Sequence, residues 1–255
     1  MRSGIAGLGL ASLVALAGCD QPTAPAAAND APAPAPAAAP ALSGPHPEIR
    51  AAVNPSLSAA EAKNLETAVG KIAADGKISH AIADGPVVFL HYAGARDGKP
   101  AVMLHMLQFD EAGAVTAEDI VGHLGASADL AMAGGRGSGS ADAATEAANK
   151  ATVTKFYESI SDTNKRTQLG ETVADTYVEH SVAPPVEPGA AGLIKTIGAT
   201  PQTLTVKAIG AWGDLVAADI TVATSDGAAG WNYGPGGDIF RLEGGKVVER
   251  WRVNY

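Results

Sequence analysis

Hydrophobic positions recur with two different periods in the second half of the chain. Four apolar residues keep helical spacing and predict a helix over about 141–160 with one buried face: Val153, Phe156, Tyr157 and Ile160. Two more helical stretches are predicted, over about 164–177 and in "GAAGLIKTI". Apolar-rich runs bounded by Gly- and Asp-bearing turns then predict strands at about 203–210, 214–224, 231–243 and 246–254. Helices followed by an antiparallel meander indicate the α+β class.

The first half shows a shorter version of the same pattern. A helix is predicted over about 58–74, with Ser58 as its N-cap and Glu61 as the capping-box partner three residues on. Strands follow in "KISHAIA", "PVVFLHYA" and "AVMLHMLQF". Between the halves, Gly, Ala and Ser dominate and the periodicity ends. We therefore expect two folded units, 46–121 and 143–255, joined by a linker at 122–142.

The N-terminal residues have the pattern of an export signal. Arg2 precedes the apolar run "IAGLGLASLVALAG", which is too short for a spanning helix. "LAGC", ending at Cys19, resembles the lipobox of bacterial lipoproteins, in which the cysteine is acylated and becomes the mature N-terminus. The resemblance implies a signal peptide at 1–18 and a lipid anchor on Cys19. The Ala/Pro-rich stretch at 19–45 is expected to be a tether, because such a composition buries no core.

Charge narrows the classes of partner. The 255-residue chain has a formal net charge of −9, and loss of Arg2 with the leader makes the mature chain more acidic. No basic stripe is visible, so nucleic acid is not an expected partner. We expect a protein of the cell envelope, on the periplasmic side, that touches the membrane through lipidated Cys19.

The two units also resemble each other. "HAI-ADGPVVFLHY" aligns with "KAIGAWGDLVAADI", and "MLQFDEAGAVT" aligns with the "DIFRLEGGKVV" hairpin. The chain is interpreted as an incomplete copy followed by a complete one. The alternative is a chance match of two hairpins, since hairpins share Gly and Asp for reasons of turn geometry.

Motifs of the second unit resemble a known family. "TYVEHSVAPPVEPGAAGLIKTI", then "GDLVAADI", then "DIFRLEGGKVVERWRV" is similar in order and spacing to the SnoaL-like family of the nuclear-transport-factor-2-like superfamily, over residues 148–255. The resemblance implies a cone-shaped, curved antiparallel sheet with covering helices, complete in the C-terminal unit and shortened in the N-terminal one. Family members perform polyketide cyclase-type aldol condensation or isomerise small rings without a cofactor, while others only bind or dimerise. The fold therefore implies a pocket and leaves the reaction open.

The closing strand departs from the family's pattern. The family often has Glu-His-Trp-Asp where this chain has Glu249-Arg250-Trp251-Arg252. Strand alternation places Arg250 and Arg252 on the same face. The aspartate that serves some members as a base is absent. Arginine does not accept a proton, but it can bind a carboxylate or stabilise an oxyanion.

Two catalytic candidates remain in the second unit. His180, in "YVEHS", matches the family's histidine and serves either as a general base or as a hydrogen-bonding group at the pocket rim. Asp238 either took over as acid/base or pairs with Arg250 or Arg252. The expected ligand-binding residues are Tyr177, Trp212, Phe240, Arg250 and Arg252, with a core role as the alternative for the three aromatic residues. The glycine-rich "YGPGGD" is expected to form a bulge or turn.

Three histidines of the first unit raise the question of a metal. His80, His91 and His105 fall on predicted strands, and a loop at 93–100 would bring His91 and His105 nearly opposite each other. No Cys or clear carboxylate completes the set. We expect packing histidines and no metal or cofactor.

Two functions follow from these residues. The first is an envelope lipoprotein whose pocket binds a small apolar or carbonyl-bearing molecule, with proton abstraction, aldol-type condensation or isomerisation as its chemistry. The alternative is a non-catalytic ligand-binding or protein-interaction module, in which the sheets pair within the chain or in a homodimer. An open cone with an unpaired His180 or Asp238 favours the first, and a filled cone favours the second.

Overall fold

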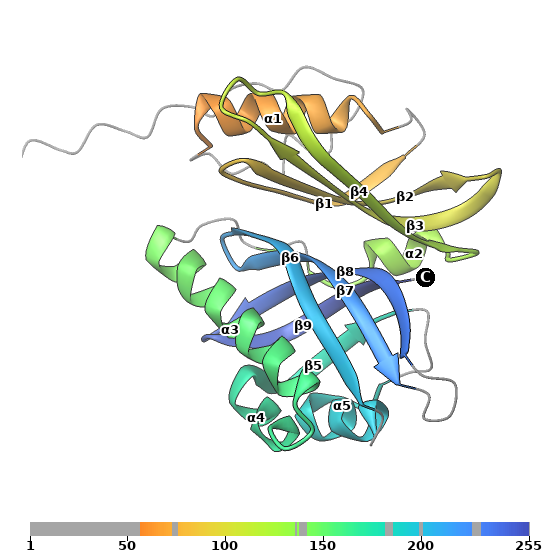
Figure 1. Cartoon of the computed structure of the whole chain (residues 1–255), viewed down its shortest axis with the longest axis vertical. Coiled ribbons are helices and arrows are strands. Elements are labelled where there is room, and N and C mark those ends of the chain that lie inside the picture. Colours follow the sequence, from red (N-terminus) through yellow and green to blue (C-terminus); the bar gives the residue numbers. More distant parts are fainter. Residues whose placement is uncertain are drawn as a thin grey trace, which may run out of the picture. The chain divides into compact units, whose positions relative to one another are not determined.

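Two antiparallel meanders form the framework of the structure (Figure 1). The computed structural model describes residues 57–72, 76–135, 137, 142–181, 186–198, 201–225 and 231–254, without the side chains of 225, 231–233 and 254. The predicted leader, Cys19, the tether and part of the predicted linker lie outside these residues. The described residues all belong to one compact unit, 36–255.

The N-terminal half holds one helix and a four-stranded sheet. Helix α1 (Ala59–Val69) begins at the predicted capping box, in which Ser58 and Glu61 bond each other's backbone N–H. The strands lie in the order β1-β2-β3-β4, with bounds β1 (Lys77–Asp84), β2 (Val87–Arg96), β3 (Lys99–Phe109) and β4 (Val115–Leu124). Strand β4 and the short helix α2 (Ala128–Met132) were not predicted, and both fall at least partly in the range expected to be a linker.

The turn between β2 and β3 corrects the expected histidine pairing. Asp97 and Gly98 both have positive φ and close a two-residue turn, so the loop is shorter than the predicted 93–100. His91 therefore pairs with Leu104, and His105 pairs with Leu90. Neighbouring register positions point to opposite faces, so His91 and His105 do not lie across from each other.

The C-terminal half has the complete set of helices and a five-stranded sheet. Its helices are α3 (Ala143–Ser161), η2 (Arg166–Gln168), α4 (Leu169–Thr172) and α5 (Gly189–Ile197). Its strands, in the order β5-β9-β8-β7-β6, are β5 (Val173–His180), β6 (Gln202–Trp212), β7 (Leu215–Ser225), β8 (Trp231–Glu243) and β9 (Lys246–Asn254). The α+β class and the curved sheet with covering helices are confirmed, and the N-terminal half is a four-stranded meander.

Two local predictions in this half are wrong. The expected helix over 164–177 ends at Thr172, and β5 then pairs in parallel with β9. The two buried residues of β5, Val173 and Tyr177, lie four positions apart, a spacing that also fits a helical face. The expected bulge at "YGPGGD" is also absent, because Gly234 to Asp238 pair without interruption with β7.

Three apolar clusters divide the described residues into layers. One lies between α1 and the first sheet, and one lies between the second sheet and its helices α3 to α5. The third joins side chains of the first sheet, such as Leu104, to side chains of the second, such as Leu215 and Ile239. The two sheets therefore pack face to face (Figure 1). Helix α1 covers the other side of the first sheet and α3 to α5 cover the other side of the second, whereas α2 packs in the cluster between the sheets.

Ion pairs bridge the same two sheets. Asp84, at the end of β1, accepts from Lys150 Nζ at 2.7 Å and from the Ala211 N–H at 3.0 Å. Lys207 on β6 donates to Asp119 on β4 and lies 3.1 Å from Asp219 on β7. Among the described residues, no helix is long and apolar enough to cross a membrane.

Candidate functional site

Asp238 and Arg250 form a buried two-point ion pair inside the C-terminal cone. Arg250 Nε donates to Asp238 Oδ1 at 3.0 Å, and Arg250 Nη2 donates to Oδ2 at 2.8 Å. Both residues are at most 1% exposed. The pair joins β8 to β9 diagonally, since Asp238 lies opposite Arg252 in register and Phe240 lies opposite Arg250. Planar two-point pairing is the geometry that suits guanidinium and carboxylate best.

Two tyrosines and a second carboxylate extend this pair into a cluster. Tyr157 on α3 donates its hydroxyl to Asp238 Oδ2 at 2.7 Å. Glu179 on β5 lies 3.6 Å from Arg250 Nη1 and accepts from the Tyr177 hydroxyl at 2.5 Å. We call these five residues the cone cluster.

Burial and charge fix the protonation of Tyr157, Tyr177 and Arg250. Burial raises the pKa of Tyr157 well above its usual value, and the Asp238 carboxylate raises it further. Burial and Glu179 act in the same way on the pKa of Tyr177. For Arg250, burial lowers the pKa, but Asp238 and Glu179 raise it by more, to well above its usual value. Both tyrosines therefore stay protonated as donors, and Arg250 stays charged.

Aromatic rings fill the space around the cluster. Phe156 and Phe240 meet edge to face at 5.2 Å, and both rings are 0% exposed. The Arg250 guanidinium lies 5.3 Å from the centre of the Phe156 ring and 5.6 Å from that of Phe240. The cone interior at this level is thus occupied by the protein's own side chains.

The remaining predicted residues do not join the cone cluster. Arg252 lies further along β9, half-buried, and its Nε has no hydrogen-bond partner among the described residues. Trp212 packs in the cluster between the two sheets, on the face away from Phe240. Only Tyr177, Asp238, Phe240 and Arg250 of the predicted set come together.

His180 lies on the opposite face of the sheet from Asp238. Its Nε2 is 3.1 Å from Glu249 Oε2, and its ring stacks on Trp251 with 5.0 Å between centres. The His180 side chain is 14% exposed and that of Glu249 is 12% exposed. The two predicted catalytic residues therefore do not form one constellation.

Glu249 is a hub that the sequence analysis did not single out. Its carboxylate accepts from Arg241 Nε at 2.8 Å and from the Gly135 N–H at 2.9 Å, besides its contact with His180. Burial raises the pKa of Glu249, but Gly135, Arg241 and His180 lower it by more, so it ends below its usual value. The alternation that put Arg250 inward also puts Glu249 outward, and that signal could have assigned it to the outer face.

A group of polar side chains on β1 and β2 approaches the same region. A register shift between Ile78 and His80 interrupts the β1–β2 pairing, and Ser79 Oγ lies 2.7 Å from His91 Nδ1. His80 packs its ring 4.4 Å from that of Trp251. The described residues contain no group of three or more His, Cys, Asp or Glu that could hold a metal ion.

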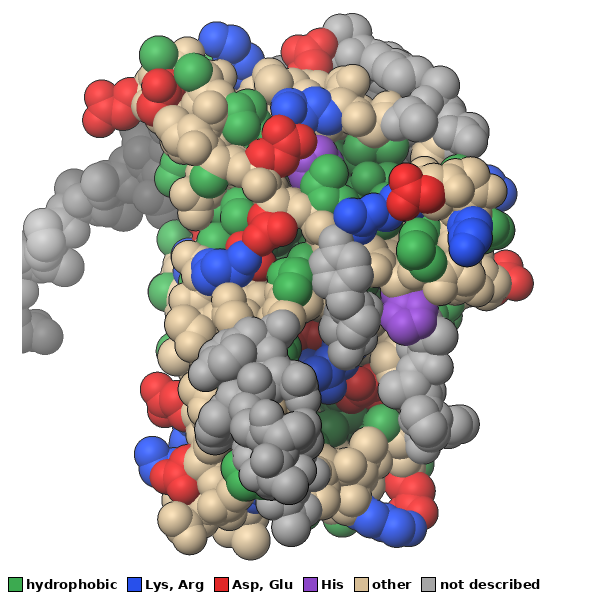
Figure 2. All heavy atoms as spheres, turned by 45° about the vertical axis from the view of Figure 1, so that its right-hand side comes forward, with side chains coloured by type: hydrophobic (Ala, Val, Ile, Leu, Met, Phe, Trp, Pro, Cys, Tyr) green, Lys and Arg blue, Asp and Glu red, His purple; other side chains and the backbone are tan. Residues whose placement is uncertain are grey.

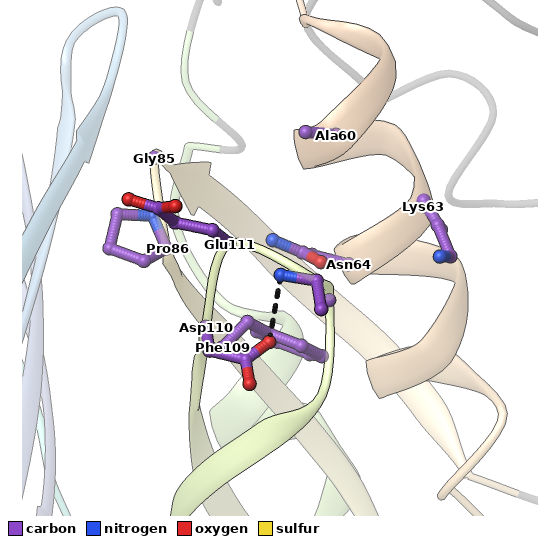
Figure 3. A pocket seen from close by; sticks show the side chains of 10 residues that line it. Ala60, Lys63, Asn64, Gly85, Pro86, Phe109, Asp110 and Glu111 are labelled. Atoms are coloured by element: carbon purple, nitrogen blue, oxygen red, sulfur yellow. Dashed lines mark hydrogen bonds between the residues drawn. The ribbon is translucent and has the colours of Figure 1, made fainter.

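A depression lies elsewhere, on the N-terminal half. It measures about 610 Å³ and is bordered by α1, the β1–β2 turn and the β3–β4 turn (Figure 3). Figure 3 shows Lys63 and Asn64 on the helix side and Asp110 with Glu111 on the turn side. Asp110 Oδ1 is already used by the N–H groups of Ala112 and Ala114, at 2.9 and 2.8 Å. A second depression, of about 330 Å³, borders Lys77 and Ala128. No residue predicted for the site lines either one.

The surface in Figure 2 carries acidic and basic side chains interspersed, without a single-sign field on that face.

Comparison with known proteins finds similarity among solved structures alone. No protein-family model matches the chain, and no curated protein matches it. A chain assigned as a SnoaL-like polyketide cyclase from Jannaschia sp. CCS1 is 16% identical, with a TM-score of 0.40, over 46% of this chain and 91% of that one. An LEH-like epoxide hydrolase of M. tuberculosis is 14% identical, with a TM-score of 0.40, over 44% and 85%. IdmH of Streptomyces antibioticus, assigned as a polyketide cyclase, is 24% identical, with a TM-score of 0.36, over 42% and 91%.

The first of these solved structures carries the family name that the motifs suggested. The three matches each cover less than half of this chain. At such identities and TM-scores the likeness describes the fold and assigns no role to any residue.

Proposed function

We propose that the C-terminal unit is a non-catalytic interaction module whose cone is closed by the cone cluster and whose outer sheet face is paired with the first unit. The observation that carries this proposal is the two-point contact between Asp238 and Arg250, with both side chains buried. This buried contact fills the cone, and a filled cone is what we expect of a non-catalytic module.

Asp238 lacks the access that a general base needs. A base must come within hydrogen-bond distance of the proton it removes. The oxygens of Asp238 accept from Arg250 twice and from Tyr157 once, and the residue is 0% exposed. A ligand would have to displace Phe240 or Arg250 to reach it, leaving a buried charge without its partner.

The outer face of the second sheet supports the interaction role. Leu215, Ala217 and Ile239 are 0% exposed because they pack against the first sheet. The contact between the two halves resembles an interface between subunits, contained here in one chain. The first unit thereby takes the place that a homodimer partner would otherwise fill.

Ligand titration followed by NMR tests the proposal. Ring signals of Phe156 and Phe240 are followed while a flat apolar ketone such as 2-acetylnaphthalene is added. We expect no saturable shift in the natural protein. Phe240→Ala, which opens space beside Arg250, is the matched variant that should bind the same compound. Saturable shifts of both rings in the natural protein would contradict the proposal.

A second candidate function rests on the His180–Glu249 pair. A carboxylate that holds one imidazole nitrogen orients the ring and makes its other nitrogen a better base. The pair is partly exposed, unlike Asp238. Proton abstraction from a carbonyl-bearing molecule at His180 would be lost in His180→Ala with little change in unfolding free energy, and turnover that survives this change excludes His180.

Anchoring in the cell envelope is a separate proposal. It is supported by "LAGC" and by the Ala/Pro-rich stretch that follows Cys19. Cys19→Ser should move the protein from the membrane fraction to the soluble fraction of the envelope. Retention in the membrane after a high-salt wash would show that Cys19 is not the anchor.

A further inference from the structure

The segment Ala133–Gly135 is held by three side chains from two strands, β1 and β9. Trp251 Nε1 on β9 donates to Ala133 O at 2.9 Å, and the Gly135 N–H donates to Glu249 Oε2 at 2.9 Å. His80 Nε2 on β1 lies 3.2 Å from Gly135 O. We call this segment the strap, because it ties β1 of the first sheet to β9 of the second.

The strap fits too closely to be replaced by ordinary residues. Gly134 has φ of +77°, and a Cβ at this position would come 2.0 Å from Glu249 Oε2 and 2.6 Å from His180 Nε2. Because the strap is packed this closely, a small displacement of His80, His180 or Glu249 displaces it.

The imidazoles of His80 and His91 satisfy this arrangement when both are neutral. His80 Nε2 must carry a hydrogen to donate to Gly135 O, which leaves Nδ1 as an acceptor. The Nδ1 atoms of His80 and His91 lie 3.4 Å apart, and Ser79 Oγ lies 3.1 Å from the first and 2.7 Å from the second. The Ser79 hydroxyl also donates to the His91 carbonyl oxygen at 3.0 Å, which leaves its own oxygen to accept from an imidazole.

Among the described residues, no carboxylate contacts the His91 ring. The residue is 1% exposed, and its Nδ1 contacts Ser79 Oγ and His80 Nδ1. The charged or titratable groups facing it are His80 from β1 and His180 from β5. His180 contacts Glu249 from β9, and Glu249 also accepts from Arg241 of β8 and from the Gly135 N–H. The strap contributes only backbone atoms to these contacts.

We propose that Ser79, His80 and His91 form an acid-sensitive fastener, which holds the strap and the two sheets together while the imidazoles are neutral and releases them when His91 gains a proton. Protonation places a positive charge on a ring that is 1% exposed and whose Nδ1 lies 3.4 Å from that of a second imidazole. The released state accepts the proton in water.

The direction of the pH effect follows from linkage. Burial lowers the pKa of His91 well below its usual value, and His80 and His180 lower it further. In the released state its pKa returns to about 6.5. Below that pH the released state binds one more proton than the closed state, so release becomes about tenfold more favourable with each pH unit lost. Above it, the fastener is fully closed. Glu249, whose pKa lies below its usual value, titrates at lower pH and does not contribute between pH 7.5 and 5.

Hydrogen exchange on the full chain tests the fastener. Protection of the Gly135 amide and of the β1–β2 ladder is measured from pH 7.5 to 5 and corrected for intrinsic exchange. We expect protection to fall about tenfold per pH unit below about pH 6. Amides of α3, which pack in the other core, should keep their protection.

Three variants separate the fastener from a structural role. His91→Gln should reduce the fall to less than about threefold per pH unit, because the titrating group is gone, whatever its effect on protection at pH 7.5. Ser79→Ala should lower protection at every pH and keep the slope. His123→Gln, on β4, should match the natural protein. A natural protein without the slope, an unchanged slope in His91→Gln, or a parallel fall in α3 would each overturn the proposal.

Discussion

Arg250 holds both carboxylate oxygens of Asp238 in the middle of the C-terminal cone, at 3.0 and 2.8 Å, and neither residue is more than 1% exposed. The contact answers the question raised by the two arginines of the closing strand. One arginine points inward and is neutralised by a carboxylate from the neighbouring strand. The cone is thereby closed with a charge pair in place of a ligand.

Removing one partner of this pair should cost stability. Asp238→Asn leaves Arg250 buried with Glu179 at 3.6 Å as its nearest remaining carboxylate. Breaking a buried pair in this way typically costs about 3–5 kcal/mol, and urea denaturation measures it. Asp175→Asn, at an exposed position of β5, is the control and should change stability by less than about 0.5 kcal/mol. A similar small change in Asp238→Asn would show that the pair is not closed in solution.

Gly134→Ala should destabilise the protein more than its backbone conformation alone explains. Its Cβ would collide with Glu249, His180 and Trp251, so the strap must leave its seat. Gly125→Ala is the matched control, because Gly125 has nearly the same φ, +81°, with no atom within 4 Å. The control should lower the free energy of unfolding by about 1–2 kcal/mol, and Gly134→Ala should lower it by clearly more. Equal losses in thermal melts would mean that the strap is loose.

Much of the fold could be predicted from periodicity and turn residues. Val153, Phe156, Tyr157 and Ile160 form the buried stripe of α3, and the capping box at Ser58 starts α1. Errors arose where local signals compete. Strand β5 follows a helical turn directly and pairs with β9, about 70 residues later in the chain. Its pairing therefore has no local signal in the sequence.

The site was less predictable for a related reason. Alternation placed Arg250 inside the cone, and the Asp238 pairing was among the alternatives. Tyr157 was expected only as a core residue, because its hydroxyl contact with Asp238 depends on how α3 crosses the sheet. His180 and Asp238 fall on opposite faces, which depends on the register of β5 against β9. Such registers are set by tertiary packing and not by local sequence.

The two halves should associate even when the chain is divided. Fragments 46–135 and 142–255 share the apolar cluster between the sheets and the Lys150–Asp84 ion pair. We expect them to co-purify after co-expression. Leu104→Glu puts a charge at a position 2% exposed in that cluster and should separate them, whereas Val115→Glu, at 37% exposure, should not. Fragments that purify apart without any substitution would contradict the face-to-face packing.

Asp219 should make stability fall as the pH rises from about 4 to about 6. Burial raises its pKa to about 6, although Lys207 acts to lower it. In the unfolded chain Asp219 ionises near pH 3.9, below its pKa in the folded state. Ionisation therefore favours the unfolded state across this window, and the free energy of unfolding falls. Asp219→Asn removes the effect. The free energy of unfolding of the variant minus that of the natural protein should rise by on the order of 2 kcal/mol between pH 4 and pH 7.5, as measured by urea denaturation. A constant difference at all pH values would show that Asp219 titrates normally.

The central claim, that the cone is filled, is tested most directly by crystals of the protein under xenon pressure. Xenon enters apolar cavities that are large enough and leaves packed interiors empty. We predict no xenon site among Phe156, Tyr157 and Phe240 in the natural protein, and a site beside Arg250 in Phe240→Ala. A xenon atom within the cone of the natural protein, next to an Asp238 that is not bonded to Arg250, would contradict the account.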